Sequence, residues 1–94
     1  GGPSPEVEDA FFGTYDATGS FEAAFQAAAD VAKEEAQKED DNYDEAKWNE
    51  CKDAGFGAMQ NALANGEQDP GKVFGAVLMG IVACGEAQQG TNQD

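Results

Sequence analysis

This sequence contains no histidine and no arginine, and its five lysines stand against 19 acidic residues. Without histidine, the chain has no imidazole base and no usual set of zinc ligands. Without arginine, it has no bidentate clamp for a phosphate or a carboxylate group. The two cysteines cannot form a cysteine–histidine catalytic pair. These absences argue against catalysis, and we expect a protein that is not an enzyme and carries no cofactor.

Positive charge is also scarce, because the formal net charge is −14. A protein that binds nucleic acid neutralises phosphates with lysine and arginine, so we expect no nucleic-acid partner. The negative charge of the protein is also repelled by anionic membranes, which argues against them as partners. A cationic protein, a polyamine or Ca²⁺ is compatible with this charge. The alternative is a well-solvated acidic surface that has no charged partner.

Long hydrophobic runs are missing as well. The longest apolar run covers residues 73–83 and is interrupted by Gly75 and Gly80. A membrane-spanning helix needs about 18–20 apolar residues, so we expect no membrane insertion. Large aliphatic residues are rare, with two Leu and one Ile against 17 Ala and six Phe. This composition predicts thin helices that pack closely through alanine, with aromatic rings filling the gaps.

The patterning predicts an all-α fold, with three main helices and a short N-terminal helical segment in one domain at residues 6–90. Residues 1–5 are expected to form a flexible lead, and residues 91–94 a polar tail. The short segment is predicted at residues 6–12, because acids favour a helix N-terminus. Residues 13–20, rich in Gly, Thr and Asp, are predicted to form a loop.

The three main helices are predicted from their capping residues. The first covers residues 20–38, with Ser20 as N-cap. The second covers residues 42–64, with Asn42 and Glu45 forming a capping box and Gly66 as the stop. The third covers residues 69–89, with Asp69 as N-cap, proline in the first turn and Gly90 as the stop.

The third main helix is apolar around most of its circumference, which is typical of a central core helix. Its members Phe74, Val77, Leu78 and Ile81 are therefore expected to be buried in the bundle or at a contact with a partner. Two glycines of the second main helix, at positions 55 and 57, each cost about 1 kcal/mol in a helix interior. They indicate a kink or a closely packed neighbouring helix.

Cys51 and Cys84 are predicted to form a disulfide between the second and third main helices. Cys51 lies 13 residues before the end of its helix, and Cys84 lies 14 residues after the start of the next. At about 1.5 Å per residue, both lie roughly 20 Å from the connecting turn. A disulfide would place the protein in an oxidising compartment, so we expect secretion. The alternative is two buried free thiols.

The segment between the first two main helices is strongly acidic. Aligned with a calcium-binding EF-hand loop, it lacks the glycine at the sixth position and the glutamate at the twelfth. A solvated loop between helices is therefore favoured over a calcium site. A weak association with Ca²⁺ remains open for Glu39, Asp40, Asp41 and Asp44.

The aromatic residues suggest a binding surface, because large rings beside Ala and Gly can enclose an apolar ligand. The same rings can also simply fill a core, and an apolar excess can bury a second copy of the chain. The candidate residues for an apolar groove or interface are Phe21, Phe25, Trp48, Phe56, Phe74 and Leu78.

Taken together, these patterns predict a small secreted acidic binding protein whose partner is an apolar ligand or a second copy of the chain. One alternative is a structural domain of a secreted matrix or fibre that assembles in response to salt or pH. A further alternative is an acidic inhibitor of a cationic, nucleic-acid-binding site.

Overall fold

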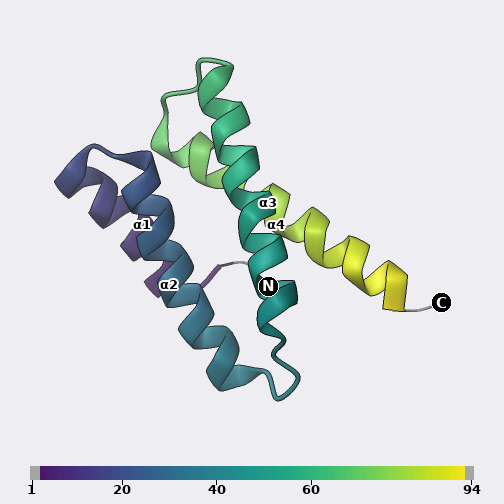
Figure 1. Cartoon of the computed structure of the whole chain (residues 1–94). Helices are drawn as coiled ribbons and strands as arrows, with labels where there is room; N and C mark the ends of the chain where they lie inside the picture. The colour runs from purple at the N-terminus through teal and green to yellow at the C-terminus, as the bar shows by residue number, and fades with distance from the viewer. Residues whose placement is uncertain (1–2, 93–94) are drawn as a thin grey trace. The chain divides into compact units, whose positions relative to one another are not determined.

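The computed structural model describes residues 3–92, with side chains described as far as Gln88, and confirms the all-α prediction (Figure 1). The described residues form four helices, which are α1 (Pro5–Thr18), α2 (Phe21–Glu39), α3 (Glu45–Ala64) and α4 (Pro70–Asn92). The chain divides into two compact units, one with α1 and α2 and the other with α3 and α4. The single domain at residues 6–90 stays a prediction.

Helix α1 is twice as long as the predicted segment at residues 6–12. It begins after Ser4, whose hydroxyl accepts a hydrogen bond from the Val7 amide at 3.2 Å. It ends at Gly19, which has a φ of 70° and donates its amide to the Tyr15 carbonyl at 2.7 Å. The prediction of a loop at residues 13–20 is therefore wrong. The segment before α1 is also shorter than the predicted lead at residues 1–5, because Pro5 is already helical.

Contacts with α2 explain why α1 continues through residues of weak helix propensity. The Tyr15 ring stacks on Phe21 with centroids 4.4 Å apart. At the other end, the Ser4 hydroxyl lies 2.8 Å from each carboxylate oxygen of Glu35 and donates to that carboxylate. Tertiary packing stabilises most helices in proteins more than propensity does. The buried residues of this pair are Val7, Phe11, Ala24, Phe25, Ala28 and Ala29.

The N-terminus of α2 follows the prediction, and that of α3 does not. Ser20 caps α2 by accepting a hydrogen bond from the Ala23 amide at 3.0 Å. After α2, the Asp40 side chain accepts from the Asn42 amide at 2.8 Å, and the Asp40 carbonyl accepts from the Tyr43 amide. An aspartate that bonds the backbone two residues on favours a turn over a helix. Asn42 therefore lies in a turn, and α3 begins at Glu45.

The connection between α3 and α4 has the predicted capping residues. Gly66 adopts a left-handed backbone with a φ of 91°, and the Glu67 amide donates to the Ala62 carbonyl. The Asp69 carboxylate accepts from the Gly71 amide at 2.9 Å, with proline as the first helical residue. At its other end, α4 continues to Asn92, so the predicted stop at Gly90 is wrong. The predicted tail therefore begins within the helix, and residues 93–94 lie outside the described residues.

Glycine lets α3 and α4 approach each other closely. A Cβ atom on Gly55 would lie 2.8 Å from Ile81 Cγ1, and one on Gly80 would lie 2.9 Å from Ala58 Cβ. Gly57 has nothing within 4 Å of such an atom. The predicted close neighbour is therefore confirmed at Gly55 and absent at Gly57. The buried residues of this pair are Gly55, Met59, Val73, Phe74 and Val77.

Within its own helix pair, α4 is covered on one side only, whereas its composition predicts a central core helix. Val73, Phe74 and Val77 are buried, but Ile81 is 37% exposed, and Leu78 is only half-buried. In this unit, α3 is the helix that packs against α4, and one neighbouring helix covers one side only. Ile81 is therefore not part of the buried core, although its side chain lies against Gly55, and a contact of Ile81 with a partner stays a prediction.

The close approach of α3 and α4 predicts opposite effects for two Gly→Ala substitutions. We expect Gly57→Ala to stabilise the protein by about 1 kcal/mol, because alanine favours a helix and space is open there. We expect Gly80→Ala to destabilise it, since the new methyl group meets Ala58 and the Ala54 carbonyl oxygen at 3.0 Å. Overpacking costs about 1–3 kcal/mol, more than the gain in helix propensity. Urea unfolding of both variants is the measurement, and equal stabilisation would contradict the close approach.

Candidate interaction surface

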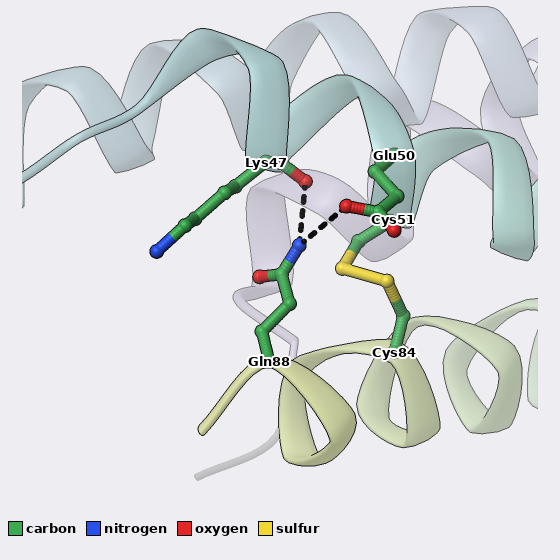
Figure 2. Close-up of a disulfide and its surroundings, with 5 residues drawn as sticks. All are labelled: Lys47, Glu50, Cys51, Cys84 and Gln88. Carbon is green, nitrogen blue, oxygen red and sulfur yellow. Dashed lines mark hydrogen bonds between the residues drawn. A yellow bond between two sulfur atoms is a disulfide. The ribbon is translucent and has the colours of Figure 1, made fainter. Parts of the chain in front are cut away.

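A disulfide joins Cys51 of α3 to Cys84 of α4, as predicted (Figure 2). The two Cα atoms are 5.3 Å apart, and both residues are half-buried. One turn further along α4, the Gln88 side-chain amide donates to the Lys47 carbonyl at 3.3 Å and to the Glu50 carboxylate at 3.2 Å (Figure 2). These contacts hold the second half of α4 against the first half of α3.

The disulfide and the two glycine contacts show which side of α4 faces α3. Val73, Val77, Gly80 and Cys84 follow one another at intervals of three or four residues, so they lie on one side of the helix. Each of them is either buried or in contact with α3. The opposite side of α4 is therefore the side that α3 does not cover.

That opposite side carries exposed apolar residues. Met79 is 75% exposed and Val82 is 57% exposed. A Cβ atom on Gly75 would have nothing within 4 Å, so the space above this glycine is open. We call this side the outer face of α4 and define it by Gly75, Ala76, Met79, Val82 and Ala83.

The six residues predicted to form a groove are divided between the two helix pairs. Phe21 and Phe25 belong to the first pair, and Phe25 is buried in its core. The other four belong to the second pair, where Phe74 is buried in the core. Their assembly into one groove stays a prediction. The residues of the second pair are Trp48, Phe56, Phe74 and Leu78.

Trp48, Phe56 and Leu78 are all half-buried. The Lys52 ammonium nitrogen lies 5.9 Å from the centre of the Trp48 ring, at the outer limit of a cation–π contact. Of the six predicted residues, Phe74 and Leu78 each adjoin a residue of the outer face in sequence, and of these two only Leu78 lies outside the buried core. Sequence reasoning missed Met79 and Val82 as site residues. The available signal was the apolar arc of α4, which is wider than one neighbouring helix can cover.

The acidic segment between α2 and α3 shows no arrangement suited to a metal ion. Among the described residues, no group of three or more acidic or cysteine side chains is close enough to hold one. The Asp40 carboxylate instead accepts a hydrogen bond from the Asn42 amide. The structure therefore gives no support to calcium binding at Glu39, Asp40, Asp41 and Asp44, which are all exposed.

Helix α4 is long and apolar enough to cross a membrane by length and composition alone, over Pro70–Gln88. The expectation of no membrane insertion was based on the length of an uninterrupted apolar run. The mean hydropathy of an 18-residue window stays high even where glycines interrupt that run. The core helix of a soluble protein and a signal sequence satisfy the same criterion, so the observation is weak. It does make lipid one of the partners that an experiment on α4 has to test.

Comparisons with protein-family models, curated proteins and solved structures found no match to this chain. The chemistry of the outer face of α4 is therefore the main guide to function.

Proposed function

We propose that this protein is a small, secreted, non-enzymatic interaction protein whose binding surface is the outer face of α4. The observation that carries the proposal is the gathering of exposed large hydrophobic side chains. Among the described residues, Met79, Ile81 and Val82 stand out as exposed. Met79 and Val82 lie together on the outer face, whereas the Ile81 side chain lies against Gly55 of α3. Scattered exposed apolar residues are ordinary, but a contiguous apolar patch marks an interaction site.

The surroundings of the outer face also favour binding. Gly75, Ala76 and Ala83 have little or no side chain, so a partner helix can approach the α4 backbone closely. Burying the exposed Met79 and Val82 side chains stabilises a complex by about 25 cal/mol per Å² of apolar surface removed from water. The disulfide and the Gln88 hydrogen bonds hold this part of α4 in place, which lowers the entropy lost on binding.

Secretion is supported by the disulfide, because disulfides persist mainly in oxidising compartments. The proposed surface also suits a structural domain that assembles with copies of itself in a secreted matrix. The two functions differ in the identity of the partner, which is either another molecule or the same chain. An experiment that identifies what contacts the outer face separates them.

Photo-crosslinking tests the proposal directly. We expect benzoylphenylalanine at Met79 to give several-fold more crosslinked product than the same residue at Gln60, an exposed position near the C-terminal end of α3. The material is an extract of the source that produces the protein, and mass spectrometry identifies the products. Equal yields at the two positions would contradict the proposal. Crosslinks to lipid, with flotation on zwitterionic vesicles, would instead identify α4 as a membrane-binding segment.

A further inference from the structure

Three residues of α4 are spaced one heptad apart. Lys72, Met79 and Glu86 stand at intervals of seven, and all three are exposed. Because seven residues fall about 20° short of two full helical turns, these side chains stay within about 40° of one another around the helix. They therefore form a straight line along the outer face, with a cation at one end, an apolar residue in the middle and an anion at the other.

This line is complementary to itself when a second copy runs in the opposite direction. With Met79 on a twofold axis, residues of the line whose numbers are equally far from 79 face each other. Lys72 of one copy then faces Glu86 of the other, and symmetry repeats the pair. The flanking residues also fit, because the twofold axis keeps each flank of α4 on its own side, so that Val82 meets Gly75 and Ala83 meets Ala76. Large residues opposite small ones allow two helices to interlock.

A parallel arrangement lacks this complementarity. In parallel register, Lys72 would face Lys72 and Glu86 would face Glu86, so both charged pairs would repel. The charges thus favour the antiparallel direction.

We infer that the partner of the outer face is a second copy of this chain, paired antiparallel through α4 with Met79 at the twofold axis. This inference rests on the proposed function and names its partner. The seam from residue 72 to residue 86 is about 21 Å long at 1.5 Å per residue. A seam of this length buries less surface than a standard stable interface, so the dimer is weak and depends on concentration.

The net charge of −14 sets the conditions under which the dimer forms. Two copies repel each other over the whole molecule, and salt screens this repulsion over a Debye length of about 10 Å at 0.1 M. The apolar part of the seam is not screened. We therefore expect dimerisation to strengthen when salt is raised from about 0.01 M to about 0.15 M.

A charge swap tests the antiparallel pairing. We expect Lys72→Glu and Glu86→Lys each to weaken dimerisation roughly tenfold, because each turns two attractive pairs into two repulsive ones. The double swap, and an equimolar mixture of the two single variants, should restore it. Sedimentation equilibrium over a range of concentrations is the measurement. Both substitutions suit the α4 helix dipole, since an acid near the N-terminus and a base near the C-terminus are favourable.

Two exposed residues of α2 provide controls for net charge. Lys38→Glu and Glu34→Lys change the net charge by the same amounts, but they lie on the other helix pair. We expect Lys38→Glu to weaken dimerisation slightly and Glu34→Lys to strengthen it. Glu86→Lys also lowers the overall repulsion, so a loss of dimer in that variant identifies a local pair. Circular dichroism verifies that all the variants are folded.

The outcomes separate this inference from the proposed function. If the wild-type protein stays monomeric at all concentrations while Met79 still crosslinks to another molecule, the inference that the partner is a second copy is overturned. The proposed binding surface then remains in place. If the single variants Lys72→Glu and Glu86→Lys dimerise as strongly as the wild-type protein, the antiparallel pairing is overturned. Failure of both self-association and Met79 crosslinking overturns the proposed function as well. Loss in each single variant with recovery in the double variant supports the dimer.

Discussion

The double substitution Cys51→Ser/Cys84→Ser is expected to lower the free energy of unfolding by about 3–4 kcal/mol. The disulfide closes a loop between residues 33 positions apart, and it removes conformational entropy from the unfolded chain by that amount in the chain-entropy model. A protein of this size commonly has a total stability of only about 5–15 kcal/mol. The variant should therefore be partly or largely unfolded at temperatures where the native protein is folded.

Urea unfolding followed by circular dichroism measures this effect. The matched control is Ala46→Ser/Ala87→Ser, which places two serines at exposed positions of the same helices, outside the disulfide and the outer face of α4. The native protein treated with a dithiol reductant should resemble the cysteine variant, and alkylation with intact mass should then count two thiols. If the cysteine variant lost less than about 1 kcal/mol, the close packing of α3 and α4 would have to hold the pair together without the disulfide.

The substitution Phe11→Ala is expected to cost about 3–5 kcal/mol, the usual range for a fully buried phenylalanine. Phe11 is only 1% exposed and meets Phe12 edge-to-face at 5.4 Å between ring centroids. The surrounding core of α1 and α2 consists largely of alanine, and short side chains cannot move far enough to fill the cavity. We therefore expect the helix pair of α1 and α2 to lose much of its order.

Two further variants define the cause of this loss. Phe11→Leu keeps most of the buried volume and should cost less than about 1.5 kcal/mol. Glu8→Ala removes an exposed side chain from the same helix and should stay within about 0.5 kcal/mol of the native protein. Thermal and urea unfolding monitored by circular dichroism provide the comparison. An equal loss in Phe11→Ala and Phe11→Leu would show that the ring itself, and not its volume, holds the core.

Local chemistry in the sequence was enough to predict much of the secondary structure. Ser20 caps α2, and Asp69 with Pro70 begins α4, because each side chain or ring acts on the backbone within three residues. The disulfide was predictable for a related reason. Cys51 and Cys84 lie almost equally many residues from the short turn between α3 and α4, and the constant rise of a helix places both at the same distance from that turn. Prediction failed at Asn42, where the Asp40 side chain forms a turn that competes with the expected capping box.

Tertiary structure alone decided the length of α1 and the two sides of α4. The stacking of Tyr15 on Phe21 supports a helix where glycine, threonine and aspartate suggest a loop. Helix α4 is apolar on most sides, so its periodicity could not show which side α3 would cover. Gly55 and Gly57 are the same residue type two positions apart, yet only Gly55 faces the neighbouring helix. Composition determined that these helices could pack closely, and the one-sided contact between α3 and α4 determined which apolar residues stay available to a partner.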